Sequence, residues 1–268
     1  MKKIAVVGHH GKLGSFLVQK PNFVSLPCDV TDVADIDFIL TQSGKLYDID
    51  LIINCVAISS IPECEENYDH AIAVNVRGLD NLHKVFGERV LNISSDYVFS
   101  GSLVDGELPT EKTDPDPINA YGFTKMGAET VSIANEGKTL RLSRTVSWED
   151  NDIHVSTIFP VYYPDFFYRN YIHREFMVDG IAYFATHYDT MPSLVNYAGT
   201  DNVSMWDFMV RLVGELGGDV DKVLKKKEYD PNPPRLLHGG FSVELAKSLG
   251  FPMYSLDDTV SKLVETWQ

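Results

Sequence analysis

Short apolar segments and longer helix-like segments alternate along the chain up to about residue 145. Five segments have the nearly continuous apolar character of buried strands: Ile4–Val7, Phe23–Leu26, Asp50–Val56, Val90–Ser94 and Leu140–Leu142. Helix-like segments lie between them: Lys12–Gln19, Val33–Leu40, Asn67–Val85 and Ala120–Ala134. Strands without an alternating polar face are buried on both sides. The pattern therefore predicts an α/β fold whose parallel sheet is covered by helices on both faces.

The pattern changes after Ser147, so we expect one domain over residues 1–147 and a smaller lobe over 148–268. Residues 148–174 are irregular and rich in aromatic side chains, which suits either a small second core or a pocket lined by rings. A strand near 193–198 is expected to return to the sheet. The helices predicted beyond residue 174 are Val178–Ala185, Ser204–Leu216 with Asp207 at its capping-box position, Ser242–Leu249 and Leu256–Trp267.

Acidic residues outnumber basic ones by 38 to 23, which gives a net charge of −15 at pH 7. Such a surface repels phosphate backbones and argues against a nucleic-acid partner. No segment approaches the roughly 18 to 20 apolar residues of a membrane span, and Ile4–Val7 is too short for a targeting signal. Three cysteines do not make a disulfide framework. We expect a cytoplasmic protein without a membrane partner.

A glycine-rich turn, Gly8-His9-His10-Gly11-Lys12-Leu13-Gly14, follows the first predicted strand directly. Glycines at these positions permit a tight turn and bring backbone N–H groups close to a pyrophosphate. The place of the turn between a strand and a helix predicts a dinucleotide site. Adjacent histidines with no third ligand nearby do not predict a metal site, although His10 could contact a cofactor phosphate.

The second strand lacks the acid that commonly holds the adenosine ribose, because it ends in Ser25-Leu26-Pro27. The nearest acid is Asp29, which together with Val30 could contact adenine or could be a plain loop aspartate. The expected cofactor is therefore NADP or NAD, with a slight preference for NADPH.

Tyr121 and Lys125 are four residues apart and share one face of a predicted helix. A cation beside a phenol lowers the tyrosine pKa from about 10 toward working pH, which makes the hydroxyl a usable proton donor. Ser95 follows the fourth strand, and ligands of parallel sheets bind outside the carboxyl ends of the strands. Ser95 could then hydrogen-bond the carbonyl that Tyr121 protonates; the alternatives are a chance surface pair and a strand-ending turn.

At these residues the chain resembles the extended short-chain dehydrogenases/reductases, and within them the dTDP-4-dehydrorhamnose reductase family. The resemblance implies a Rossmann-like, doubly wound sheet. The matching segments occur in family order: Gly8 to Gly14, Asn54-Cys55-Val56-Ala57, Cys64-Glu65, Asn75-Val76-Arg77-Gly78, Ser94 to Phe99 with Gly101, Glu111, and Tyr121 to Glu129.

The resemblance implies that Tyr121 is the proton donor, that Ser95 is its hydroxyl partner and that Lys125 binds the nicotinamide ribose. Asn75 would lie on a helix that points toward the active site. The alternative interpretation is that Asn75 is a buried helix-cap or core residue. Residues 1–147 would bind NAD(P). The expected cofactor-lining residues are Gly8, His10, Gly11, Lys12, Leu13, Gly14, Asp29, Val30, Cys55, Val56, Ala57, Ile58 and Asn75.

The lobe over 148–268 would bind the substrate, with Asp96, Arg174 and Arg235 as contacts. Surface arginines are the alternative at both arginine positions. The segment 148–174 is shorter than in typical family members. The family's Arg-Thr-Ser can be aligned with either Arg141-Leu142-Ser143 or Arg144-Thr145.

The reaction implied by the resemblance is NAD(P)H-dependent reduction of the C4 ketone of a nucleotide-linked 4-keto-6-deoxy sugar. One alternative uses the same site for epimerisation or dehydration with a recycled cofactor. The other is a non-catalytic regulatory subunit of the methionine adenosyltransferase beta type. Members of the superfamily often dimerise, so a homodimer is also expected.

Overall fold

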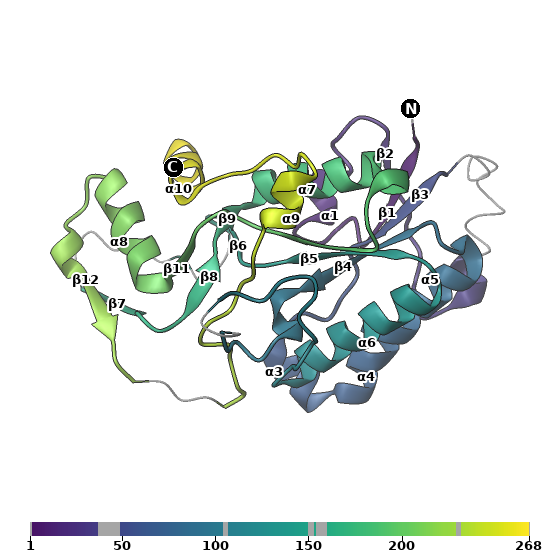
Figure 1. Ribbon diagram of the computed structural model, residues 1–268, viewed down its shortest axis with the longest axis horizontal. Helices are drawn as coiled ribbons and strands as arrows, with labels where there is room; N and C mark the ends of the chain where they lie inside the picture. The colour runs from purple at the N-terminus through teal and green to yellow at the C-terminus, as the bar shows by residue number, and fades with distance from the viewer. Residues whose placement is uncertain are drawn as a thin grey trace.

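Six parallel strands form the central sheet of the protein, in the order β2-β1-β3-β4-β5-β10 (Figure 1). The computed structural model describes residues 2–36, 49–103, 107–149, 153, 160–228 and 232–267. The strands are β1 (Ile4–Val7), β2 (Phe23–Ser25), β3 (Leu51–Asn54), β4 (Val90–Ser95), β5 (Lys138–Leu142) and β10 (Leu194–Tyr197). The predicted α/β, Rossmann-like fold is confirmed, and the sixth strand returns beside β5 as expected.

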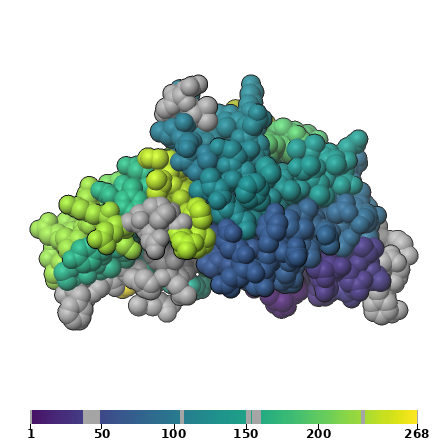
Figure 2. Space-filling model, turned by 90° about the horizontal axis from the view of Figure 1, so that it is seen from below, coloured from purple at the N-terminus to yellow at the C-terminus, as the bar shows by residue number. Residues whose placement is uncertain are grey.

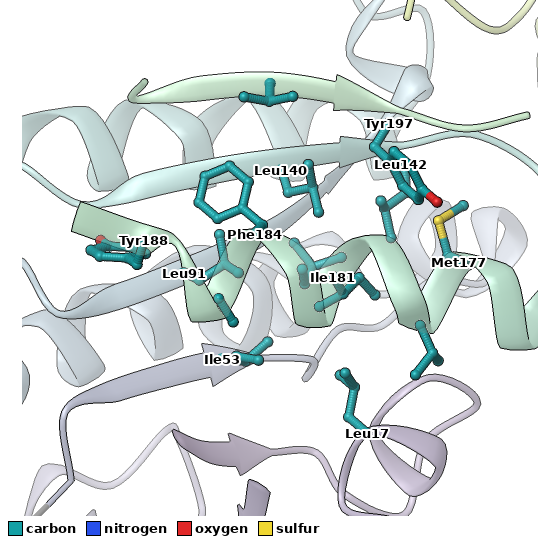
Figure 3. Packing of buried hydrophobic residues seen from close by; sticks show 14 of the residues in the cluster. Leu17, Ile53, Leu91, Leu140, Leu142, Met177, Ile181, Phe184, Tyr188 and Tyr197 are labelled. Atoms are coloured by element: carbon teal, nitrogen blue, oxygen red, sulfur yellow. The ribbon is translucent and has the colours of Figure 1, made fainter. Parts of the chain in front are cut away.

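Alternate residues of each strand enter two separate cores, as a sheet covered on both faces requires. In β1, Ile4 and Val6 face one core, while Ala5 and Val7 face the other, and all four are fully buried. Figure 3 shows the first core, in which Ile181 and Phe184 lie against the sheet residue Leu140. A strand with a polar face could not occupy this position.

Helices cover the two faces unequally (Figure 1). One face carries α3 (Ile61–Glu66), α4 (Tyr68–Ile72), the π-helix η2 (Ala73–Arg77), α5 (Gly78–Phe86) and α6 (Ala120–Ala134). The other face carries α1 (Gly14–Leu17), α7 (Arg174–Thr186) and α9 (Glu244–Ser248). Among the described residues, no helix has both the length and the apolar character that a membrane crossing requires.

Two predicted helices differ from the structure. The helix expected over Lys12–Gln19 is shorter and consists only of α1. The glycine turn extends to residue 13, and after Leu17 the backbone makes turn hydrogen bonds between residues three apart. Of the segment Asn67–Val85, residues 68–85 are helical but contain the π-helical turn η2, and Asn67 is the non-helical N-cap of α4. Of the helix expected over Val33–Leu40, residues 33–36 are helical, and 37–40 lie outside the described residues.

The C-terminal lobe, which we define as the parts of residues 160–174, 202–228 and 256–265 outside the sheet core, adds a third core at one end of the sheet (Figures 1 and 2). Its helices are α8 (Met205–Glu215) and α10 (Leu256–Glu265). Short strand pairs connect it: β7 (Val161–Pro164) with β12 (Val223–Lys226), β8 (Tyr168–Asn170) with β11 (Asn202–Ser204), and β6 (Thr145–Val146) with β9 (Ile172–His173). Single-turn helices are η3 (Asp96–Val98), η4 (Tyr188–Thr190) and η5 (Val220–Lys222).

The lobe contains regular structure where the sequence suggested an irregular segment. Three short strands, β7, β8 and β9, lie within residues 161–173. Strands of two to four residues are too short to show an alternating pattern. The remainder of the aromatic segment, residues 150–152 and 154–159, lies outside the described residues.

Candidate active site

A cavity of about 830 Å³ lies between the carboxyl ends of the sheet strands and the C-terminal lobe. This is the position at which ligands of doubly wound sheets bind. Ten of the residues expected to form a site line it: Gly11, Lys12, Leu13, Cys55, Ala57, Ser95, Asp96, Tyr121, Lys125 and Arg235. The other lining residues are Asn54, Ser59, Ile93, Ser94, Tyr97, Leu142, Ser143, Arg144, Thr145, Phe167, Arg169, Tyr171 and Met205.

The close approach of α6 to the end of β4 brings Tyr121 to Ser95. The Asn119 side chain caps α6 by accepting a 2.9 Å hydrogen bond from the Gly122 N–H. Gly122 is needed here, because a Cβ at this position would lie 2.2 Å from the carbonyl oxygen of Tyr97. At this separation the Tyr121 and Ser95 side chains line the same cavity, and the Tyr121 ring contacts Tyr97 edge-on with 5.6 Å between ring centroids.

Burial strongly raises the pKa of Tyr121, and the nearby Asp96 and Tyr97 raise it further. The nearby Ser95 hydroxyl opposes this rise. The expectation that a neighbouring cation lowers this pKa is therefore wrong, because desolvation dominates the pKa of Tyr121. Tyr121 holds its proton firmly.

Lys125 is almost fully buried, and its Nζ donates a 2.9 Å hydrogen bond to the carbonyl oxygen of Ile93. The same nitrogen lies 5.9 Å from the centroid of the Tyr121 ring. Burial lowers the pKa of Lys125 to about 8, although Cys55 and Glu129 act in the opposite direction. The lysine is therefore mostly protonated at neutral pH and places one positive charge inside the cavity.

The glycine turn is tight in the way that a dinucleotide site requires. The Gly11 N–H donates to the Gly8 carbonyl oxygen at 3.0 Å, and Gly8 has a φ of +81°. A Cβ on Gly8 would lie 2.9 Å from the backbone of Cys55, and one on Gly14 would lie 2.3 Å from the Gly8 oxygen. Only glycine fits these close approaches. The residues present therefore fit a nicotinamide dinucleotide, with Gly11, Lys12 and Leu13 facing the cavity.

Several expected cofactor residues lie away from the cavity lining. His10 is exposed and its ring contacts that of His9, with 4.0 Å between centroids. Asp29 is exposed, and hydrogen bonds from Thr31 lower the pKa of its carboxyl. Val30 is buried in the core beneath α5. Gly8, Gly14, Val56 and Ile58 shape the turn and the loop after β3 without lining the cavity.

Asn75 has a supporting position instead of a lining one. Its Oδ1 accepts a 2.8 Å hydrogen bond from the Ile58 N–H, and its Nδ2 donates to the Ile58 carbonyl oxygen at 3.0 Å and to Thr124 Oγ1 at 2.8 Å. The side chain is 3% exposed. Asn75 thus holds the loop that carries Cys55 and Ala57 against α6, which matches the alternative of a buried core asparagine.

The arginines separate into pocket and core residues. Arg235 and Arg144 line the cavity, whereas Arg141 is buried in an ion pair with Glu129. The structure therefore places Arg144, of the two aligned alternatives, in the pocket. Arg174 corrects our expectation of a substrate contact: it is buried at the start of α7, hydrogen-bonded to Ser147 and paired with Glu149, and it is not among the lining residues.

Sequence reasoning missed Arg169, which lines the cavity from β8 and is buried. No local pattern marks it, because its partners are distant in sequence. The aromatic segment did carry a signal: Phe167 and Tyr171 line the cavity, and Tyr171 also belongs to the third core. Within the described residues, no group of three or more His, Cys, Asp or Glu side chains is placed to hold a metal ion.

The sheet order, the glycine turn and the Ser95–Tyr121–Lys125 arrangement define an extended short-chain dehydrogenase/reductase. The family model described as the RmlD substrate binding domain matches residues 1–149, more than half of the chain. The chain belongs to this family, which confirms the resemblance to dTDP-4-dehydrorhamnose reductases.

Comparison with known proteins gives partial sequence matches and a full-length fold match. A probable low-salt glycan biosynthesis reductase of Haloferax volcanii is 34% identical over 123 residues, which are 45% of this chain and 40% of that protein. A dTDP-4-dehydrorhamnose reductase of Mycolicibacterium smegmatis is 30% identical over 145 residues, 50% of this chain and 42% of that protein. The chain therefore spans about two fifths of the length of these curated relatives.

The beta subunit of methionine adenosyltransferase 2 from Rattus norvegicus is 37% identical over 90 residues, 32% of this chain and 25% of that subunit. Among solved structures, the dTDP-4-dehydrorhamnose reductase of Bacillus anthracis in complex with NADP superposes with a TM-score of 0.84 and covers 99% of this chain and 100% of that chain. At 20% identity this match shows the fold.

Proposed function

We propose that the protein is an NAD(P)H-dependent reductase that converts the C4 ketone of a nucleotide-linked 4-keto-6-deoxy sugar to an alcohol. The observation that carries this proposal is the meeting of Ser95, Tyr121 and Lys125 in one cavity with residues of the glycine turn. Family membership and the partial matches to dTDP-4-dehydrorhamnose reductases support the sugar class.

When bound, a reduced nicotinamide cofactor supplies the hydride that reaches the sugar C4. Tyr121 gives its hydroxyl proton to the ketone oxygen, which becomes the alcohol oxygen. Ser95 hydrogen-bonds the same oxygen and stabilises the charge that develops there. Lys125 holds a positive charge beside Tyr121 and stabilises the phenolate that remains after the proton has left.

Local cations allow an acidic protein to bind two anionic ligands. Lys12 at the glycine turn is placed for cofactor phosphate, and Arg144 and Arg235, which also line the cavity, are candidates to bind the diphosphate of the sugar nucleotide. These three side chains interrupt a surface whose net charge is −15. The site thus supplies local positive charge for both anionic ligands.

The test is the oxidation of NADPH and of NADH by the purified protein with dTDP-4-dehydrorhamnose and with its UDP counterpart. We expect turnover, faster with NADPH, and its loss in Tyr121→Phe. Tyr68→Phe, which alters a tyrosine that is 44% exposed on α4, should keep the wild-type rate. The proposal fails if neither cofactor is oxidised with either sugar. Tightly retained cofactor without net consumption would indicate an epimerase or a dehydratase.

A second candidate is a regulatory subunit that binds a methionine adenosyltransferase. The local 37% identity to the rat beta subunit favours it. Copurification with a methionine adenosyltransferase, together with no turnover of either keto sugar, would support this role against the reductase.

A further inference from the structure

The two carboxylate oxygens of Asp96 accept hydrogen bonds from two different parts of the protein. Its Oδ1 accepts a 3.2 Å hydrogen bond from Ser95 Oγ, the hydroxyl that lines the cavity with Tyr121. Its Oδ2 accepts a 2.9 Å bond from Ser143 Oγ and a 3.1 Å bond from the Gly240 N–H, and lies 3.6 Å from Arg169 Nε. One carboxylate, 3% exposed, thus joins the catalytic serine to Arg169 and Gly240, which follow it by more than seventy positions.

Arg169 is held rigidly on the lobe side of this contact. Its guanidinium donates to the carbonyl oxygens of Tyr168 at 2.6 Å and Leu236 at 3.1 Å, and to the Tyr97 hydroxyl at 3.4 Å. A Cβ on Gly239 would lie 2.2 Å from its Nη1, so the guanidinium packs directly on that backbone. Arg169 therefore moves only together with β8 and the segment containing Gly239.

We propose that Asp96 and Arg169 are positioning residues that make the position of the Ser95 hydroxyl beside Tyr121 depend on the placement of the C-terminal lobe. This inference rests on the proposed reductase function. Neither residue exchanges a proton or hydride with the substrate. The lobe, which carries Arg169, and the catalytic serine are linked through one buried carboxylate.

The direction of the Ser95 hydrogen explains how this positioning works. A serine hydroxyl has one hydrogen to donate. With that hydrogen on Asp96 and the Tyr97 N–H donating to Ser95 Oγ at 3.3 Å, Ser95 presents an acceptor lone pair to the cavity instead of a free hydrogen. Tyr121 therefore receives no proton from Ser95 and keeps its own until a ketone oxygen enters and accepts hydrogen bonds from both hydroxyls.

The charges of Asp96 and Arg169 also affect the pKa of Tyr121. The groups that face the Tyr121 side chain are Lys125 on the same helix, Cys64 on α3, and Ser95, Asp96 and Tyr97 at the end of β4. Asp96 is the one carboxylate among these groups, and it raises the pKa of Tyr121 by repulsion between like charges. Arg169 neutralises part of that charge at 3.6 Å.

The test compares Asp96→Asn, Arg169→Met and Arg169→Lys in the full chain. We expect Asp96→Asn to lower kcat by up to about 100-fold while leaving the Kd of NADPH unchanged, because a misplaced donor costs rate without removing a cofactor contact. The alkaline limb of the kcat profile, which reports loss of the Lys125 and Tyr121 protons, should move down in Asp96→Asn and up in Arg169→Met, because the two variants remove opposite charges near these groups. Arg169→Lys keeps the charge and should restore the wild-type limb.

A matched control and a measurement without substrate complete the design. Asp116→Asn removes an exposed carboxylate that accepts a hydrogen bond from the Ser100 N–H, and should leave kcat and its profile unchanged. In protein labelled with carbon-13 at tyrosine Cζ, the signal absent from Tyr121→Phe belongs to Tyr121. That signal should shift at neutral pH in Asp96→Asn and stay in place in Asp116→Asn.

The outcomes separate this proposal from the proposed function. If the wild type reduces neither keto sugar but the Tyr121 signal shifts in Asp96→Asn, the reductase function is wrong and the positioning role stands. The positioning role is overturned if the wild type reduces the sugar and one of two results follows. In the first, Asp96→Asn and Arg169→Met leave both the Tyr121 carbon-13 signal and the alkaline limb of the kcat profile unchanged. In the second, the two variants move the alkaline limb in the same direction. Should Arg169→Met fail to fold, Asp96→Asn and Arg169→Lys decide the question.

Discussion

Arg141 and Glu129 form a buried, two-bond ion pair beneath the helix that carries Tyr121 and Lys125. Arg141 Nε donates to Glu129 Oε1 at 2.8 Å, and Nη2 donates to Oε2 at 2.6 Å. Ser94 Oγ adds a 2.5 Å hydrogen bond to Oε1. Because Glu129 lies one turn after Lys125, the ion pair fixes α6 against β4 and β5 close to the cavity that Tyr121, Lys125 and Ser95 line.

Glu129→Gln should destabilise the protein strongly, because it leaves the Arg141 charge buried without its partner. Removal of one member of a buried pair costs about 3 to 5 kcal/mol. Asp80→Asn is the matched comparison: it breaks the exposed Asp80–Lys84 pair, whose closest atoms are 2.8 Å apart, and should cost less than about 1 kcal/mol. Urea unfolding measures both. Equal losses for the two variants would contradict the role given to the buried pair.

The glycine turn can be tested by separating backbone strain from steric overlap. Gly217 has a φ of +72°, and no atom lies within 4 Å of the place a Cβ would take there, so Gly217→Ala should cost about 1 kcal/mol from the left-handed backbone alone. Gly8→Ala has the same strain and also places its Cβ 2.9 Å from the backbone of Cys55 and Val56. It should cost at least about 1 kcal/mol more, since overlap in a packed site adds to the strain.

Cofactor affinity supplies a second readout for the same two variants. NADPH binding, followed by its fluorescence, should weaken in Gly8→Ala and remain at the wild-type level in Gly217→Ala. A Gly8→Ala protein that binds NADPH normally would show that this turn does not hold the dinucleotide.

The sheet and the Tyr121 helix could be predicted because their signals are local. Continuous apolar strands identified β1, β3, β4 and β5, and the helix expected over Ala120–Ala134 has the bounds of α6. The motif residues Ser95, Tyr121 and Lys125 then meet because strand ends and helix faces determine where they point.

The lobe side of the site could not be predicted because its contacts are not local. Arg169 meets Asp96 across 73 positions, and it sits on a strand of only three residues. Arg141 and Arg144 could be told apart only in the structure, where Arg141 within β5 faces α6 and Arg144 follows the end of the strand. The raised pKa of Tyr121 has the same origin, because burial depends on tertiary packing.

The three thiols should be unreactive in the folded protein. Burial raises the pKa of Cys55 to about 12, and burial with nearby carboxylates raises the pKa of Cys28 and of Cys64 to about 11. At pH 8 a thiol with a pKa near 11 is only about one part in a thousand thiolate, the reactive form. We expect a disulfide reagent to modify the native protein slowly and to titrate all three thiols in guanidinium. Rapid modification of a native thiol would contradict the raised pKa values of these thiols.

Lys125 should make stability rise with pH over a defined window. Its pKa falls from 10.5 in the unfolded chain to about 8 in the folded protein, so between these values the unfolded chain carries a proton that the folded protein lacks. The free energy of unfolding then increases with pH. The gain should reach about 3 kcal/mol across the window. Below pH 8 both states hold the proton, and the full penalty of burying the charge is present.

Lys125→Met removes this contribution, so the comparison with wild type isolates it from the other groups that titrate. The variant should be more stable than wild type at neutral pH, and its advantage should shrink by about 3 kcal/mol as pH rises from 8 to 10.5. Lys84→Met, which replaces an exposed lysine on α5, is the matched control. Urea unfolding across the window measures the difference. An advantage of Lys125→Met that stays constant with pH would mean that Lys125 is not desolvated in the folded protein and keeps its ordinary pKa.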